Sequence, residues 1–183
     1  GENILGSGHI SINKFSGHIL PEEKSSFKEG YKIVSFYIDA ESLIKRAYVL
    51  RQEGWREKEN IGYYQRMFEA KKISSMRKYL TENSRVFINN IISTIAENQI
   101  KLFDRKGNPI IINDKGEFEG DNASTNVTPA LIEINDECNI IGLIDGQHRT
   151  YAYHEGDDIY EPHIAKLRKI QNLLVTGILF PQP

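Results

Sequence analysis

The stretch NIIGLIDGQHRTYAYHE (residues 139–155) is the part of the chain that decides the predicted fold. Its apolar run ends abruptly in Asp-Gly, and polar residues follow before the aromatic residues resume. A short and continuously apolar run is typical of a strand that is buried on both faces. We therefore predict a strand over 138–144, a turn at Gly146, and a helix from there to about Glu155. Cys138 would open the strand as a small buried residue.

The rest of the chain predicts an α+β fold with a small mixed sheet flanked by helices. The segment PALIEIND alternates in period two, and its residues 131–135 are expected to pair antiparallel with the strand 138–144 across a tight turn. Residues 85–95 fit a helix by spacing and a strand by composition. The remaining expected elements are strands over 31–40 and 172–180, helices from Asp39 to about Gln52, over 61–80 and over 162–171, and a β-hairpin insertion around 98–113.

Length and composition describe an ordinary globular protein. The chain has 183 residues, of which 39% are hydrophobic and 26% charged, enough for one domain with its own core. A net charge of −2 gives no overall attraction to nucleic acid or membranes, so any DNA contact would need a local basic patch. One cysteine excludes an internal disulfide, and no apolar run is long enough to predict a membrane span. The expected location is cytoplasmic, and residues 1–30 are expected to form a partly flexible arm.

The DGQHR turn has the residue types of an anion site. A strand that ends in a glycine turn and opens a helix leaves backbone N–H groups without partners, and the helix dipole favours negative charge there. Gly146 would let the ligand approach, Arg149 offers a planar fork for phosphate oxygens, and His148 is a titratable group. Gln147 and Asp145 are polar neighbours. The alternative is purely structural: Asp145 caps the helix, Gln147 and Arg149 are solvated, and His148 bonds a carbonyl.

A second candidate is a basic segment on the helix predicted over 61–80. Between residues 66 and 85 the chain carries six basic and two acidic side chains, a local charge of +4. Arg66 and Arg77 are eleven residues apart, which places them on one helix face. The segment is either a solvated helix face or a phosphate-facing stripe that contacts DNA. Its candidate DNA-binding residues are Arg66, Lys71, Lys72, Arg77 and Lys78.

The pentapeptide DGQHR (residues 145–149) resembles the DGQHR-domain family. That family is typified by the B protein of the Dnd DNA phosphorothioation systems and is related to the ParB/sulfiredoxin superfamily. The segment YYQRMFEAKKISSMRKYL is similar to the family's second motif, with Gln65, Arg66, Tyr79 and Leu80 as the matching positions. FYIDAESLIKRA looks like its opening strand and helix. The resemblance covers roughly residues 31–180.

The resemblance implies a ParB/sulfiredoxin-like core over residues 31–183, truncated at its C-terminus relative to the family. It also implies a strand over 86–92, and a phosphate site lined by Gly146, Gln147, His148 and Arg149. Family members continue into a helical region beyond the last predicted strand. The catalytic cysteine of sulfiredoxins has no counterpart, because Gln147 stands at that position.

Three functions remain open from the sequence. The first is a regulator or accessory factor of a DNA-modification or defence system, which binds DNA or a nucleotide. The second is a nucleotide hydrolase or a ParB-like nuclease with Mg²⁺, in which His148, Arg149 and Asp145 would be catalytic. The third is a nucleotide-sensing module without catalysis. The expected cofactor is a nucleotide (ATP, CTP or GTP) with Mg²⁺, and no site for a protein-bound metal is predicted, since His154 and His163 lack a metal-ligand spacing with His148. Other proteins of the DNA-modification system, and a second copy of the chain, are further expected partners.

Overall fold

The computed structural model describes residues 13–20, 30–50, 59–112, 118–119 and 127–181. Side chains are described for these residues except for 59–69, 112, 118 and 119, where only the backbone is described. The strands are β1 (Lys14–Leu20), β2 (Lys32–Asp39), β3 (Ala47–Val49), β4 (Ile91–Ala96), β5 (Ile100–Phe103), β6 (Pro109–Ile112), β7 (Phe118–Glu119), β8 (Thr128–Ile134), β9 (Ile141–Asp145) and β10 (Asn172–Phe180). The helices are α3 (Ala40–Arg46), α4 (Glu59–Asn83), the short 3₁₀ helix η2 (Glu97–Gln99), α5 (Gln147–Tyr151) and α6 (Glu161–Ile170).

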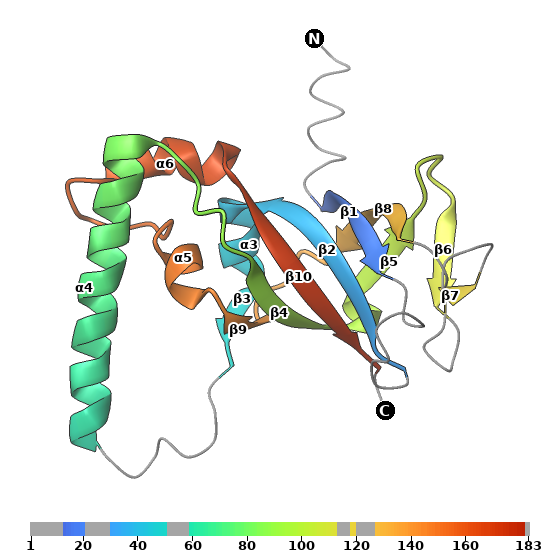
Figure 1. The fold of residues 1–183 in the computed structure, drawn as a ribbon, viewed down its shortest axis with the longest axis horizontal. Helices are drawn as coiled ribbons and strands as arrows, with labels where there is room; N and C mark the ends of the chain where they lie inside the picture. Colours follow the sequence, from blue (N-terminus) through green and yellow to red (C-terminus); the bar gives the residue numbers. More distant parts are fainter. Residues whose placement is uncertain (1–12, 21–29, 51–58, 113–117, 120–126, 182–183) are drawn as a thin grey trace.

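The strands form one mixed sheet. Within the described ranges it has ten strands in the order β3-β9-β4-β10-β2-β1-β8-β5-β6-β7. The pairs β3–β9 and β4–β10 are parallel, and the other neighbours are antiparallel. Helices α3 to α6 gather toward the β3 and β9 end, and the β5–β6–β7 strands lie at the other end (Figure 1). The α+β prediction is confirmed, but the sheet is much larger than the small sheet expected.

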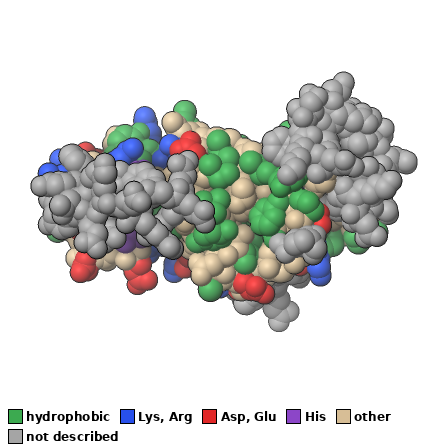
Figure 2. Space-filling model, turned by 90° about the horizontal axis from the view of Figure 1, so that it is seen from below, with side chains coloured by type: hydrophobic (Ala, Val, Ile, Leu, Met, Phe, Trp, Pro, Cys, Tyr) green, Lys and Arg blue, Asp and Glu red, His purple; other side chains and the backbone are tan. Residues whose placement is uncertain are grey.

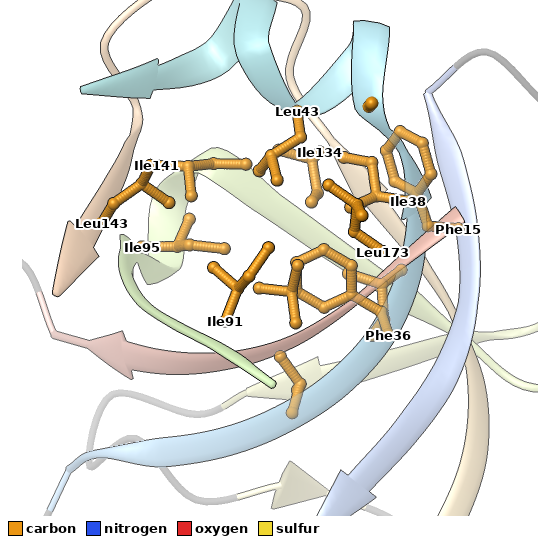
Figure 3. Packing of buried hydrophobic residues seen from close by; sticks show 14 of the residues in the cluster. Phe15, Phe36, Ile38, Leu43, Ile91, Ile95, Ile134, Ile141, Leu143 and Leu173 are labelled. Atoms are coloured by element: carbon orange, nitrogen blue, oxygen red, sulfur yellow. The ribbon is translucent and has the colours of Figure 1, made fainter. Parts of the chain in front are cut away.

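A hydrophobic cluster formed by the described residues holds the helices on the sheet. Every second residue of β2, namely Val34, Phe36 and Ile38, is buried, as the period-two geometry of a strand requires. The strands curve around these side chains, so that residues from distant strands such as Ile141 and Ile134 point toward a common interior (Figure 3). Other hydrophobic side chains stay at the surface, across the middle of the face seen from below (Figure 2).

Several local predictions are confirmed. Asp39 caps α3, because its carboxylate accepts the backbone N–H of Ser42 at 2.9 Å. The hairpin of β5 and β6 closes around a turn in which Gly107 has a φ of 85°, a left-handed conformation that glycine adopts without strain. The predicted helix over 162–171 and the strand over 172–180 correspond to α6 and β10.

The helix predicted from Asp39 to Gln52 ends much earlier, at Arg46. The residues after it, Ala47 to Val49, pair in parallel with β9. Tertiary pairing at the sheet edge therefore overrides the helical spacing of this segment. The helix expected up to Glu155 also ends early, at Tyr151.

The expected hairpin of residues 131–135 and 138–144 is wrong. β8 pairs with β1 and β5, whereas β9 pairs with β3 and β4. The guanidinium of the buried Arg46 explains the separation, since it donates to the Asn135 carbonyl at 3.0 Å while the Arg46 carbonyl accepts from Ile140 at 2.9 Å. The connection thus runs past the end of α3 instead of turning back.

Three other expectations are corrected. The arm predicted for residues 1–30 contributes β1, which lies inside the sheet between β2 and β8; residues 1–12 and 21–29 lie outside the described part. The strand predicted over 86–92 begins only at Ile91. Cys138 is exposed, not buried, because it precedes β9 in a turn where Asn139 has a φ of 58°.

Candidate functional site

The DGQHR turn connects β9 to the short helix α5. Ile141, Gly142 and Leu143 of β9 are buried, while the last two residues of the strand are exposed. Gly146 then adopts a φ of 92° and a ψ of 18°, the left-handed region in which a side chain would be strained. The Asp145 carboxylate accepts the N–H of Gly146 at 2.9 Å, and the Gly146 carbonyl accepts the hydroxyl of Thr150 at 3.0 Å. The turn is thereby closed by its own polar groups.

Gly146 serves close packing rather than ligand approach. It is buried, and a Cβ at this position would lie 2.8 Å from Cγ1 of Ile91 and 3.0 Å from Nη2 of Arg149. The space beside Gly146 that was expected to admit a ligand is therefore filled by Ile91, the first residue of β4, and by Arg149 of the motif. This corrects the expected role of Gly146.

Arg149 is held against the segment that precedes β4. Its Nη2 donates to the Asn90 carbonyl at 2.7 Å and lies 3.9 Å from the Asp145 carboxylate. The side-chain amide of Asn90 in turn donates to the Thr176 hydroxyl at 2.6 Å. The Arg149 side chain is 19% exposed, and its Nε is buried with no hydrogen-bond partner among the described residues. Arg149 is thus a positioned cation rather than a solvated one.

Gln147 and His148 are half-buried. The amide of Gln147 donates to the Ile144 carbonyl at 3.1 Å, which again bonds the motif to itself. α5 has five residues and no side-chain cap, so it is too short to build the dipole on which the expected anion site depended. Any anion site here must rest on side chains.

Arg77 is the main correction to the predicted DNA-binding residues. Its side chain is only 1% exposed and joins α4 to the end of α5. The guanidinium donates to the carbonyls of Ala152 at 3.0 Å and His154 at 2.6 Å, and it pairs with Asp158 at 2.6 Å and Glu161 at 2.8 Å. Burial disfavours its charge, but the two carboxylates raise the pKa of Arg77 overall. A buried and fully engaged cation cannot contact DNA.

The carboxylates around Arg77 form a network with α6. Burial opposes ionisation of Glu161, but hydrogen bonds from the Gly156 N–H, Arg168 and Arg77 lower the pKa of its carboxyl to about 2. The bond from Arg77 likewise lowers the pKa of Asp158. Arg168 also donates to the His154 carbonyl at 2.8 Å. The network therefore stabilises the loop between α5 and α6.

The remaining predicted basic residues differ in position. Lys71, Lys72 and Lys78 are exposed on α4, and Lys78 lies 3.9 Å from Glu82. The side chains of Gln65 and Arg66 lie outside the described residues. What is left of the predicted stripe is thus a group of exposed lysines on a helix that packs beside α5, as Figure 1 shows.

No metal centre is visible among the described side chains. They contain no group of three or more His, Cys, Asp or Glu residues that could hold a metal ion. His163 Nε2 lies 2.8 Å from the Ser84 hydroxyl, and His154 Nδ1 lies 2.6 Å from the Tyr151 carbonyl. Within the same residues, no helix is long and apolar enough to cross a membrane.

Sequence reasoning missed Asn90, whose carbonyl positions Arg149. A backbone acceptor leaves no signal in residue type, and Asn90 is 59 positions away in the chain. It also missed the roles of Asp158 and Glu161 as partners of Arg77. The signal that existed was Arg77 itself, because a charged residue on the helix face that carries Met76 and Leu80 must have buried partners.

Comparison with protein-family models, with curated proteins and with solved structures found no match to this chain.

Proposed function

We propose that the DGQHR turn binds a phosphate group of DNA or of a nucleotide, and that the protein recognises this group without transforming it. The observation that carries the proposal is that the Arg149 guanidinium is held in position but is incompletely hydrogen-bonded. Its guanidinium is held in place by the Asn90 carbonyl, and its Nε lacks an acceptor in the described residues. A positioned guanidinium is well suited to phosphate because little side-chain entropy is lost on binding.

In this proposal the Asp145 carboxylate competes with phosphate for the Arg149 guanidinium. Its carboxylate lies 3.9 Å from Arg149 Nη2, beyond hydrogen-bond distance, and its side chain is 65% exposed. Such a contact is weak, and the other oxygen of the carboxylate stays bonded to the Gly146 N–H. A phosphate oxygen would replace it beside the guanidinium and accept the bonds that the carboxylate does not.

The wider role that we propose is that of a regulator or accessory factor in a DNA-modification or defence system of the phosphorothioation type, with a ParB/sulfiredoxin-like core. The resemblance of DGQHR and of the α4 segment supports it. The packing of α4 beside α5 adds support, since the two motifs lie far apart in sequence and are joined by Arg77. Lys71, Lys72 and Lys78 are the exposed residues that would contact further DNA phosphates.

Asp145→Asn is the sharpest test, because Asn keeps the acceptor for the Gly146 N–H and removes only the competing charge. We expect the affinity for a fluorescent DNA duplex, or for ATP, CTP or GTP, to rise about two- to fivefold. Misfolding cannot produce such a gain. Arg149→Met should abolish the binding, and Arg85→Met, which changes an exposed arginine, should leave the site intact.

The same variants separate binding from hydrolysis. If the protein is a ParB-like hydrolase or nuclease, Asp145 would hold Mg²⁺, and Asp145→Asn and His148→Ala would both abolish Mg²⁺-dependent phosphate release or DNA cleavage. The binding proposal fails if Asp145→Asn weakens binding, or if wild-type protein shows no salt-sensitive affinity for DNA and no thermal shift with any nucleotide.

A further inference from the structure

A cleft on the opposite side of the sheet from the core carries a second set of polar groups. Because Val34, Phe36 and Ile38 point into the core, Ser35 and Tyr37 of β2 point to the other face. There the structure has a cavity of about 320 Å³ between β1, β2, β8, β10 and the β5–β6 turn. None of the DGQHR residues lines it.

Strand register brings the lining residues together in rows. Tyr37 lies opposite Leu174 of β10, and Ser16 lies opposite Leu131 of β8. In the neighbouring row His18 lies between Ser35 and Pro129. Side chains at paired positions on one face are about 5 Å apart, so these residues form one continuous lining.

The polar groups of the cleft have no partners among the residues that the structure describes. Ser16, His18, Ser35, Tyr37 and Arg105 all line it, and none of them has a side-chain hydrogen bond or ion pair to any other described residue. Two of the five are basic types, and the described residues that line the cleft include no acidic side chain. Polar groups that converge on a hollow without partners are typical of a ligand site.

Arg105 is carried by a rigid turn. The Asp104 carboxylate accepts the backbone N–H groups of Lys106 and Asn108, both at 2.8 Å. The Gly107 N–H donates to the Asp104 carbonyl at 3.1 Å. These bonds on both sides of Arg105 fix the backbone from which its side chain reaches the cleft.

The apolar part of the lining indicates what else the ligand carries. Leu131, Leu174 and Pro129 are half-buried, and Tyr37 is 56% exposed, so its ring is open for stacking. Aromatic faces and aliphatic side chains together favour a flat apolar group. A volume of about 320 Å³ is at the small end of ligand pockets and suits a small molecule rather than a polymer.

We propose that this cleft binds a small organic anion with a planar ring, whose negative group contacts Arg105 and His18 and whose ring lies against Tyr37, Leu131 and Leu174. The site is separate from the phosphate site at DGQHR. The protein would thus sense a small metabolite on one side of the sheet and bind its phosphate-bearing partner on the other.

Calorimetric titration of the full chain with adenosine monophosphate, benzoate, adenosine and inorganic phosphate tests the proposal. The two ring-bearing anions should bind the cleft, while adenosine, which lacks the charge, and phosphate, which lacks the ring, should bind there at least about tenfold more weakly. The phosphate titration uses the Arg149→Met variant, which removes the proposed DGQHR site. Arg105→Met should weaken the ring-bearing anions about tenfold to a hundredfold, and Tyr37→Ala should also weaken them. Lys106→Met, which changes the next cation on the same turn, is the matched control and should have no effect.

The outcome is distinguishable from that at the DGQHR turn. Arg149→Met should leave benzoate binding unchanged; benzoate is the deciding probe, because adenosine monophosphate carries a phosphate group that the DGQHR turn is also proposed to bind. If Arg149→Met abolishes benzoate binding and Arg105→Met does not, the cleft is not the benzoate site and this inference is overturned, while anion binding at DGQHR is supported. Absence of measurable binding by either ring-bearing anion at millimolar concentration also overturns it.

Discussion

Arg77→Met tests whether the buried arginine of α4 is a structural residue. Methionine keeps most of the apolar stem but removes every donor, so the effect comes mainly from lost hydrogen bonds and lost charge. Two of the groups that Arg77 bonds, the His154 carbonyl and the Glu161 carboxylate, still accept hydrogen bonds from Arg168 after the substitution. The losses that remain are the bond to the Ala152 carbonyl and the pairing with Asp158.

These losses can be given magnitudes. A buried carbonyl that loses its donor costs about 1–3 kcal/mol. Asp158 is 35% exposed, so water replaces most of its interaction, and its loss costs about 1 kcal/mol. The free energy of unfolding should therefore fall by about 2–4 kcal/mol. For a chain of this length that corresponds to a decrease in Tm on the order of 10 °C.

Urea unfolding followed by circular dichroism measures the effect, with Lys78→Met as the control. Lys78 is the next residue on α4, its side chain is 59% exposed, and its only close partner in the described residues is Glu82 at 3.9 Å. Its replacement should change the free energy of unfolding by no more than about 0.5 kcal/mol. If Arg77→Met is as stable as wild type but loses DNA binding, Arg77 is a DNA contact and the structural reasoning is refuted.

Three further changes have defined outcomes. The folded pKa of Glu161, about 2, lies below its ordinary value of 4.5. The stabilisation by its carboxylate is therefore complete above pH 4.5 and is lost as the pH falls toward 2. Glu161→Gln should flatten this loss of stability, as measured by the free energy of unfolding across that pH range. Gly146→Ala should lower the free energy of unfolding by about 2–4 kcal/mol, because its φ is 92° and the new Cβ would clash with Ile91. In Gly107→Ala the new Cβ meets no atom within 4 Å, so the cost should be only about 1–2 kcal/mol. Equal effects of the two variants in thermal melts would show that the clash is absent. Asp39→Ala should cost about 1 kcal/mol through loss of the α3 cap, and an unchanged Tm would contradict that role.

The predictions that succeeded depended on neighbours in the chain. The Asp39 cap, the turn around Gly107 and the glycine turn after β9 each follow from local backbone chemistry that a few residues contain. The alternation of PALIEIND in β8 was equally readable, since one face of a strand must be apolar when it covers a core. The strand-turn-helix order of the DGQHR segment was predicted for the same reason.

The failures depended on partners that are distant in sequence. Nothing near residues 131–144 indicates that Arg46 binds the Asn135 carbonyl and keeps β8 and β9 apart. The segment after Arg46 has helical spacing, yet it becomes β3 because an edge of β9 is available. Cys138 was judged by its apolar neighbours, although the strand begins three residues later.

The sequence by itself determined that the apolar strand over 138–144 gives way to a turn at Gly146, because the buried apolar run stops there and glycine adopts the required φ without strain. Only the tertiary structure decided the roles of the two arginines. Both are basic residues in suggestive motifs, but Arg77 meets buried carbonyls and carboxylates and becomes a structural link, whereas Arg149 keeps an Nε without an acceptor in the described residues. The physical reason is that a charge acts through the groups around it, and folding alone sets those groups.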